Sequence, residues 1–377
     1  MPVTIGIPKE LAEGERRVGL VPAVAQKYTK MGYNIVLEQG AGDSCYMPDK
    51  DFDDITIVSD AKQVYEQADV ILKVQTPTTD EINMMAAGKI VIAMMQPHNS
   101  HDQVKQMRDN NITSIAMELV PRISRAQSMD VLSSQASAAG YKAVLMGANL
   151  SSQFFPMLTT AAGTIRPARV LVIGAGVSGL QAIATARRLG AIVEAYDVRA
   201  VTKEQVESLG AKFLQLEVDA ESEGGYAREL SEAEKHNERN MLADHIAKAN
   251  VVITTAAIPG RKAPTLIDTD MVDRMMPGAV IVDLAAESGG NCTLTEAGKT
   301  IEHSNGVLIH GPENVPSMLA VNSSEMYAKN LQNLLDLMIV DGELKPDWSD
   351  EILDGSLLTH EGKIHHENTR TQIEGEE

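Results

Sequence analysis

The stretch that decides the fold runs from residue 170 to residue 197 and reads VLVIGAGVSGLQAIATARRLGAIVEAYD. Gly174, Gly176 and Gly179 form the pattern G-x-G-x-x-G directly after an apolar strand and at the start of a helix. Asp197 ends the next apolar strand. This order of strand, glycine turn, helix, strand and acidic residue is the fingerprint of a dinucleotide-binding βαβ unit.

The residues of this turn suit a bound pyrophosphate. Gly174 permits the tight turn, Gly176 lets the backbone approach the phosphates, and Gly179 lets the helix pack against the strand. Ala175 and Val177 lie between these glycines. The helix that starts here offers unpaired N–H groups and the positive end of its dipole. We therefore expect all five residues to belong to the cofactor-binding site.

Asp197 predicts which dinucleotide is preferred. A carboxylate at this position accepts hydrogen bonds from the hydroxyls of the adenosine ribose, and it would repel a 2′-phosphate. The sequence therefore favours NAD(H) over NADP(H) as the cofactor of this chain. Val198 and Arg199 follow directly and are expected to line the same ribose site, where the positive charge of Arg199 softens the discrimination.

Short apolar strands alternate with helical segments on both sides of this stretch. They read VTIGIPKE, NIVLEQGAG, ADVILKVQTP, KIVIAMMQP and TSIAMELVP before residue 122, and AKFLQL, ANVVITTA, GAVIVDLA and VLIHG after the glycine turn. This alternation is typical of α/β folds with parallel sheets. The sequence therefore predicts two α/β units.

The boundaries of these units follow from two helical segments. A helix rich in small residues is expected at about 130–148, where small side chains permit close approach of a neighbouring helix. SSEMYAKNLQNLLDLM predicts an amphipathic helix at 323–338 that returns the chain to the first unit. We expect a discontinuous first domain, 1–135 with 323–377, and an NAD(H)-binding Rossmann domain at 136–322. The polar tail from about residue 342 is expected to be poorly ordered.

Charge and composition exclude several classes of protein. The net charge of −19 disfavours nucleic-acid binding and direct adhesion to an anionic bilayer, because both need a basic face. Cys45 and Cys292 are the only cysteines, which predicts no disulfide framework and no metal site and fits a reducing cytosol. No apolar run approaches the ~18 residues of a membrane span, so we expect a cytoplasmic chain that reaches any membrane through a partner.

Several long motifs beyond the glycine turn resemble one family. They read PKE…GERRVGLVP, PRISRAQSMDVLSS…AGYKAV, TAAGTIRPARVLVIGAGVSGLQAIATARRLGA, TKEQVESLGAKF, GGYARELS, TTAAIPGRKAP and VDLAAESGGN. Together they cover about residues 1–340. They resemble the alanine dehydrogenase superfamily, and within it the NAD(H)-binding component of proton-translocating NAD(P) transhydrogenases.

The resemblance implies a fold, a reaction and partners. It implies two Rossmann-like domains with parallel sheets, NAD(H) in the cleft between them, and a homodimer. It also implies that hydride passes between NAD(H) on this chain and NADP(H) on a separate nucleotide-binding component, coupled to proton translocation by membrane-embedded subunits. The chain would then be peripheral to the cytoplasmic face of a membrane, held there by these partners.

The segment PRISRAQSMD, at 121–130, is where the resemblance places catalysis. The family has Arg, Gln and Asp side chains near the nicotinamide, and these match Arg122, Gln127 and Asp130, with Ser133 on the following turn as a cofactor contact. Gln127 both donates and accepts hydrogen bonds, Arg122 donates from a fixed fork, and Asp130 accepts. We expect an Arg122–Asp130 pair to hold Gln127 and orient the ring without moving a proton.

Further cofactor contacts are expected at three places. A polar segment of more than 20 residues carries Gly225 and Tyr226, and such long connections often act as lids. The family has a mobile loop here, whose tyrosine matches Tyr226. Ala257 and Asn314 each follow a strand of the second unit, and ligands lie outside the carboxyl ends of such strands. Met318 stands where the family commonly has Arg, so no contact is carried over there.

Two other functions stay open. Alanine dehydrogenase needs a carboxylate anchor and an acid/base group that titrates near neutral pH. Arg17 and Lys73 match its carboxylate-binding positions. Met94 stands where its catalytic His is expected, with His98 four residues later, and Glu287 replaces its catalytic Asp. Hydride exchange between two nicotinamides needs no acid/base group, so these replacements favour transhydrogenation. A non-catalytic NAD(H)-sensing module is the other alternative.

Overall fold

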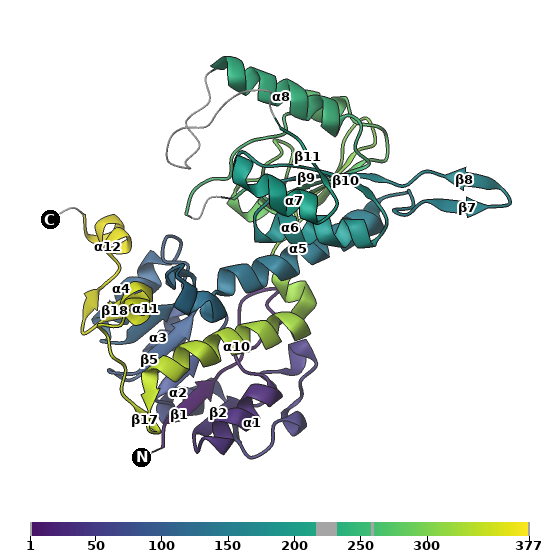
Figure 1. Ribbon diagram of the computed structural model, residues 1–377. Helices are drawn as coiled ribbons and strands as arrows, with labels where there is room; N and C mark the ends of the chain where they lie inside the picture. Colours follow the sequence, from purple (N-terminus) through teal and green to yellow (C-terminus); the bar gives the residue numbers. More distant parts are fainter. Residues whose placement is uncertain (1, 216–231, 258–259, 376–377) are drawn as a thin grey trace. The chain divides into compact units, whose positions relative to one another are not determined.

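The computed structural model describes residues 2–215, 232–257 and 260–375 of the 377-residue chain (Figure 1). The chain divides into unit 1, Met1–Gln135 with Pro316–Glu377, and unit 2, Ala136–Val315. Each unit has its own sheet, and strands from the C-terminal part of the chain complete the sheet of unit 1. The predicted α/β class and the discontinuous first domain are therefore confirmed.

The sheet of unit 1 is parallel over six strands and is extended at one edge by an antiparallel pair. Its strands are β1 Thr4–Ile7, β2 Asn34–Glu38, β3 Thr56–Val58, β4 Val70–Leu72, β5 Ile90–Ala93, β6 Thr113–Ala116, β18 Leu357–His360 and β19 Lys363–Ile364. They lie in the order β19-β18-β6-β5-β4-β1-β2-β3. The central strands β4, β5 and β6 bury every residue, as expected for a parallel sheet that is covered on both faces.

Seven described helices belong to unit 1, and α10 is the longest of them. They are α1 Pro22–Lys30, α2 Ala61–Gln67, α3 Thr79–Met84, α4 His101–Asp109, α10 Ala320–Met338, α11 Glu351–Ser356 and α12 Glu367–Glu374. Tyr327, Leu331 and Leu334 of α10 are fully buried in the core of unit 1, so this helix returns the chain to the first unit as the amphipathic pattern predicts. None of the helices in the described residues is long and apolar enough to cross a membrane.

The C-terminal segment is ordered, so the prediction of a poorly ordered tail is wrong. β18 pairs with β6, and β19 pairs with β18. Ile352, Leu353, Leu357 and Leu358 are each at most 1% exposed. The segment is polar on average, but its few apolar residues lie against a sheet edge that already exists. Pairing with that edge supplies the backbone hydrogen bonds and the core that such a segment lacks alone.

The sheet of unit 2 is parallel apart from one edge strand. Its strands are β9 Arg169–Ile173, β10 Ile192–Tyr196, β11 Lys212–Phe213, β12 Val251–Thr254, β13 Val280–Asp283, β14 Thr300–Glu302 and β15 Leu308–His310, in the order β11-β10-β9-β12-β13-β15-β14. Alternate residues of β9 enter different cores: Val170 and Val172 lie in one, Leu171 and Ile173 in the other. Both faces of this sheet are therefore covered.

Helices α5 and α6 pack tightly in unit 2, as the small residues of α5 predict. The described helices here are α5 Val131–Leu150, which begins in unit 1, α6 Val177–Arg188, α7 Lys203–Ser208, α8 Glu232–Ile246 and α9 Thr269–Asp273. A side-chain carbon at Gly140 of α5 would lie 2.0 Å from the carbonyl oxygen of Ser178. Only glycine therefore permits this approach.

Each sheet has one point where the order of its strands reverses. In unit 1, β1 lies between β2 and β4; in unit 2, β9 lies between β10 and β12. The chain runs outward from the central strand on one side and then resumes on the other. In open parallel sheets, ligands bind outside the carboxyl ends of the strands at such a point. These two places are therefore the candidate sites.

Candidate functional site

The glycine turn after β9 has the geometry of a phosphate-binding loop. A side-chain carbon at Gly174, whose φ is +100°, would lie 2.5 Å from the Thr255 hydroxyl, and one at Gly179 would lie 1.8 Å from the Gly174 carbonyl oxygen. Both positions therefore require glycine for packing. At Gly176 the nearest atom to such a carbon is a guanidinium nitrogen of Arg199, 4.0 Å away. The turn is thus open at Gly176, where a pyrophosphate would approach.

The start of α6 completes this turn. α6 begins at Val177, and its N-cap residue Gly176 has no side chain to pair with the first N–H groups. Val177 is 42% exposed, so the helix end is open to solvent on this side. Unpaired N–H groups and the helix dipole suit an anion. The residues present therefore fit the pyrophosphate of a dinucleotide.

Asp197 lies directly after β10 and is bound to the same turn. Its carboxylate accepts hydrogen bonds from the N–H of buried Ala175 at 2.7 Å and from the Arg199 N–H at 2.8 Å. The Arg199 guanidinium adds bonds of 2.9 and 3.0 Å to its two oxygens. Burial alone would raise the pKa of Asp197, but the hydrogen bonds from Arg199 and Ala175 outweigh it and lower that pKa. Asp197 is therefore an ionised acceptor.

Arg199 and Val198 are exposed beside this carboxylate. The side chain of Arg199 is 54% exposed although it pairs with Asp197, and Val198 is 61% exposed. Arg199 therefore competes with any ribose hydroxyl for the oxygens of Asp197. The sequence placed both residues near the ribose, but the paired arrangement of Asp197 and Arg199 was not foreseen.

The carboxyl end of β12 forms the neighbouring wall. The Thr255 hydroxyl donates to the Gly174 carbonyl oxygen at 3.1 Å, so the ends of β9 and β12 are tied together. Ala257 is exposed two residues further on. Fully buried Asn291 accepts from the Ala256 N–H at 3.1 Å and donates to the Ala256 carbonyl oxygen at 2.8 Å. Asn291 therefore fixes the backbone that leads to Ala257.

Sequence reasoning missed Asn291 and Asp283 as parts of this wall. Asp283, at the end of β13, is fully buried and accepts from the N–H groups of Asn291 and Cys292 at 2.7 and 3.0 Å. It also accepts from the hydroxyls of Thr254 and Thr295 at 2.8 and 2.6 Å. Both residues lie in the motif VDLAAESGGN, which was the available signal. The motif's role is therefore to hold the end of β12.

Asn314 follows β15 in a strained backbone conformation. Its φ is +42°, in the left-handed region that residues other than glycine seldom adopt. Such strain occurs often at functional sites. No contact with a cofactor follows from this alone, and the role of Asn314 stays a prediction. Gly225 and Tyr226 lie outside the described residues.

The segment 121–130 presents some of its predicted catalytic residues at the surface of unit 1. Arg122 and Gln127 are exposed, and Gln127 lies in a short 3₁₀ helix, Ser124–Met129. Asp130 accepts from the Ser133 N–H at 2.9 Å and from the Ser133 hydroxyl at 2.6 Å. Within the described residues Asp130 therefore holds the first turn of α5, and the expected Arg122–Asp130 pair is not formed.

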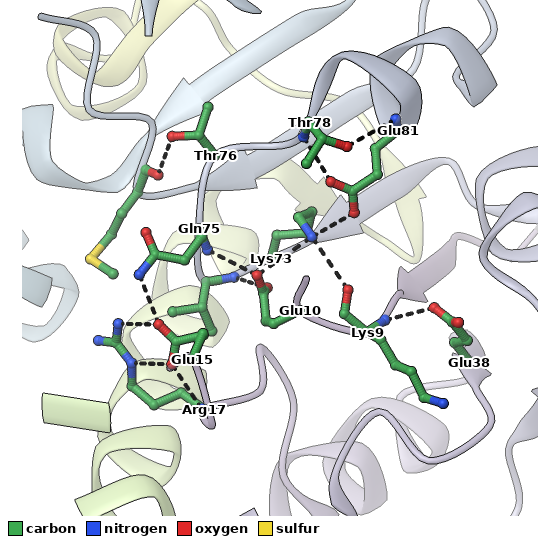
Figure 2. A network of polar contacts seen from close by, with 12 residues as sticks. Lys9, Glu10, Glu15, Arg17, Glu38, Lys73, Gln75, Thr76, Thr78 and Glu81 are labelled. Carbon is green, nitrogen blue, oxygen red and sulfur yellow. Dashed lines mark hydrogen bonds and ion pairs between the residues drawn. The ribbon is translucent and has the colours of Figure 1, made fainter. Parts of the chain in front are cut away.

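The reversal point of unit 1 holds a network of buried charges (Figure 2). Lys73, at the end of β4, is 1% exposed and lies 2.7 Å from a Glu81 oxygen and 3.4 Å from a Glu10 oxygen. Arg17 donates to Glu15 at 2.6 and 2.8 Å and to Gln135 at 2.9 Å. The two cations that the sequence linked to a substrate carboxylate thus already pair with carboxylates of the chain.

The pKa values in this network follow from burial and pairing. Burial raises the pKa of Glu10 despite the nearby ammonium of Lys73. Burial acts in the same direction on Glu15, but hydrogen bonds and charge from Arg17 outweigh it and lower the pKa to about 2. A cavity of about 280 Å³ next to the pairs is lined by Lys9, Glu10, Glu15 and Arg17, among others.

The positions linked to the acid/base groups of alanine dehydrogenase lie elsewhere. Met94 directly follows β5 and packs partly buried against the core of unit 1. His98 is exposed in the next turn, and Glu287 is exposed in a 3₁₀ helix, Ala286–Ser288. Met94 has no titratable group to take the place of a histidine. Among the described residues, no cluster of His, Cys, Asp or Glu could hold a metal ion.

Comparison with known proteins agrees with these features. The chain matches the family models "Alanine dehydrogenase/PNT, N-terminal domain" over residues 6–139 and "Alanine dehydrogenase/PNT, C-terminal domain" over residues 143–367. It is 47% identical to the first of the parts that make up NAD(P) transhydrogenase subunit alpha in Rhodospirillum rubrum, over 96% of this chain and 97% of that protein. Identity with alanine dehydrogenase of Mycolicibacterium smegmatis is 30%, over 76% of this chain and 73% of that protein.

A solved structure has a similar fold. The transhydrogenase from Sinorhizobium meliloti superposes with a TM-score of 0.85 at 43% identity, over 97% of this chain and 99% of that one. The family models cover both units, and the relative from Rhodospirillum rubrum is similar over nearly the full length, so these matches assign the chain to one family. The chain belongs to the alanine dehydrogenase/PNT family, as its motifs predict.

Proposed function

We propose that this chain is the NAD(H)-binding subunit of an NAD(P) transhydrogenase. The observation that carries the proposal is the glycine turn, where packing requires glycine at two positions and the third, Gly176, faces open space. The name of the Rhodospirillum rubrum relative, a transhydrogenase subunit, supports the choice within the family, because identity with it is 47% over nearly the whole chain. The alanine dehydrogenase relatives are less similar in sequence, at 30% and 28% identity.

The cofactor of this chain is NAD(H). The N–H groups at the start of α6 and the open face at Gly176 would hold the pyrophosphate. The lowered pKa of Asp197 keeps its carboxylate ionised, so that it accepts from ribose hydroxyls and repels a 2′-phosphate. Arg199 has to share or release Asp197 when the ribose binds. NADP(H) is then left to a partner component.

The reaction is hydride transfer between two nicotinamide rings. The glycine turn and Asp197 would hold NADH, which when bound would supply a hydride to the oxidised nicotinamide of NADP⁺ on the partner. The hydrogen leaves with its electron pair, so no side chain has to accept or donate a proton. This fits Met94, which has no titratable group. Gln127 and Arg122, both exposed, would hold and orient the ring, while Asp130 fixes the start of α5.

The partners are a second copy of this chain, an NADP(H)-binding component and membrane-embedded subunits. The hairpin of β7 Leu158–Thr160 and β8 Gly163–Ile165 supports the homodimer, since it extends from unit 2 as a two-stranded arm (Figure 1). Phe154, Met157 and Ile165 on and beside it are 54%, 64% and 45% exposed. An isolated hairpin is only marginally stable in water, so a partner surface is expected to cover it.

A direct assay tests the proposal. The purified chain is mixed with the NADP(H)-binding component, and reduction of the acetylpyridine analogue of NAD⁺ by NADH is followed in the presence of NADP(H). Rapid reduction that depends on both proteins is expected. Reduction of NAD⁺ by L-alanine is measured in parallel with the chain alone and is expected to be absent.

The other outcomes identify the alternatives. Strong alanine activity would show that Arg17 and Lys73 release Glu15 and Glu81 to bind a substrate carboxylate, and the chain would be an alanine dehydrogenase. NADH binding without activity in either assay would indicate an NAD(H)-sensing module. In both cases the proposed function is overturned.

A further inference from the structure

The segment 121–130 carries the predicted catalytic side chains Arg122 and Gln127 on a tightly held backbone. Arg122 and Gln127 are exposed, whereas Ala126 and Met129 are 1% and 4% exposed. The polar groups that hold this backbone come from the part of the chain that follows unit 2. They belong to α10 and to Asp350, the N-cap residue of α11, about two hundred residues later in the sequence.

The first contact is made by α11. The Arg125 guanidinium donates to both oxygens of Asp350, at 2.7 and 3.0 Å. Asp350 is itself held, because its Oδ1 accepts from the Ile352 N–H at 2.9 Å and caps α11. The same helix touches the start of the segment, where a side-chain carbon at Gly355 would lie 3.3 Å from Pro121 Cδ. α11 therefore contacts the segment at two points.

The second contact is made by α10. The amides of Asn330 and Asn333 donate to the Ser128 carbonyl oxygen at 2.8 and 2.9 Å. Asn330 is 8% exposed, and its Oδ1 accepts from the Ser134 hydroxyl at 2.8 Å. This second bond fixes which way the Asn330 amide faces. The chain is thus tied to elements outside the segment on both sides of Gln127, through the Arg125 side chain before it and the Ser128 carbonyl after it.

We propose that Arg125, Asp350 and Asn330 are positioning residues for hydride transfer. They hold the backbone on either side of Gln127 in one place, so that its amide meets the nicotinamide in a fixed geometry. None of the three supplies a group to the reaction. The inference rests on the proposed function, since it assigns a purpose to the rigidity of the segment that carries Gln127. Misplacing a reacting group by about 1 Å can lower a rate by about a hundredfold.

The test uses Arg125→Gln, Asp350→Asn, the double variant of these two, and Asn330→Asp in the full chain. Asp350→Asn keeps the oxygen that caps α11 but loses the charge that faces Arg125. Asn330→Asp is isosteric and sets a carboxylate oxygen against the Ser128 carbonyl oxygen. Arg108→Gln is the matched control, because Arg108 also pairs with the C-terminal segment, at 2.6 Å from Glu374, but away from 121–130.

Three quantities are measured: hydrogen exchange of amides 122–130, the NADH dissociation constant, and kcat and KM for transfer with the partner component. Faster exchange and a kcat lowered by about tenfold or more are expected, with NADH affinity unchanged. The double variant should have the same kcat and exchange rates as either single variant, since each single variant already removes the same Arg125–Asp350 contact. Arg108→Gln should match the wild type.

Unchanged exchange in all three single variants would overturn the inference, as would faster exchange with an unchanged kcat. A loss of NADH affinity that accounts for the whole effect would reduce these residues to part of the binding wall, which also contradicts the proposal. A wild-type chain that transfers no hydride would overturn the proposed function and the positioning role with it. In that case hydrogen exchange of amides 122–130 would still show whether Arg125, Asp350 and Asn330 hold the segment.

Discussion

Asp197 holds the glycine turn through its carboxylate, and in the proposed function the same carboxylate accepts from the ribose of NAD(H). We expect Asp197→Asn to keep the hydrogen bond from Ala175 but to lose the charge that favours NAD(H). A hydrogen bond to a charged group contributes about 1.5–3 kcal/mol, so the NADH dissociation constant should rise by about tenfold or more. Discrimination against NADPH should fall at the same time. Fluorescence titration with both dinucleotides measures the two effects.

A matched control separates this effect from a general loss of charge. Asp244→Asn removes a carboxylate of the same unit that pairs with Arg274 at 2.7 Å and is 64% exposed. It should leave both dissociation constants unchanged. If Asp197→Asn bound NADH as tightly as the wild type does, and likewise bound NADPH as tightly, the role given to Asp197 would be contradicted.

Glu15 makes the stability of unit 1 depend on pH. Its pKa in the folded chain is about 2, below its ordinary value of 4.5. The pair with Arg17 therefore stabilises the fold fully above pH 4.5, and this contribution is lost as the pH falls from 4.5 to about 2. Because the pair is buried, Glu15→Gln should lower the free energy of unfolding by roughly 3–5 kcal/mol at neutral pH.

Urea denaturation of the wild type and of Glu15→Gln across the acidic range measures this prediction. The difference in unfolding free energy between the two should shrink toward acidic pH. Glu66→Gln is the control, because Glu66 pairs with Lys62 at 3.7 Å on the surface, where both side chains are more than half exposed. A difference for Glu15→Gln that does not vary with pH would contradict the assignment.

At the scale of a single element, the glycine turn before α6 separates packing from binding. Gly179→Ala would set a carbon 1.8 Å from the Gly174 carbonyl oxygen and push α6 away from β9. Gly176→Ala meets only open space, and its φ of −76° suits alanine. We expect Gly179→Ala to lower the thermal midpoint by several degrees, since overpacking typically costs about 1–3 kcal/mol.

Gly176→Ala serves as the counterpart in the same experiment. It should keep the thermal midpoint of the wild type and weaken NADH binding, because the added methyl group fills the space that the pyrophosphate needs. Differential scanning calorimetry and NADH titration distinguish the two variants. If both variants behaved alike in stability and in affinity, the division of roles within the turn would be wrong.

At the scale of the whole molecule, the exposed hairpin of unit 2 bears on assembly. Met157 and Ile165 are 64% and 45% exposed. In the proposed homodimer they are buried by the second copy, so the double variant Met157→Asp with Ile165→Asp should shift the chain toward monomer. Sedimentation equilibrium measures the change. Val201→Asp, at an apolar residue of the same unit that is 75% exposed but lies outside the hairpin, should leave assembly unchanged.

Much of the fold was predictable because its signals are local. The alternation of apolar strands and helices predicts both sheets, and the amphipathic pattern at 323–338 predicts the return of the chain in α10. The C-terminal strands were not predictable. β18 is stabilised by pairing with β6, about 240 residues earlier, and a short polar segment gives no sign of such a distant partner.

The sequence by itself determined the glycine turn, the acidic residue after β10 and the family, since each depends on residue types at fixed short spacings. Tertiary structure alone decided which contacts hold these groups. Arg199 pairs with Asp197, Asn291 hydrogen-bonds to the backbone after β12, and Asp350 pairs with Arg125. Two of these three contacts join residues that are 35 and 225 positions apart, and the third depends on a rotamer choice. No local pattern encodes the two distant contacts, because they exist only after the sheets have brought the segments together.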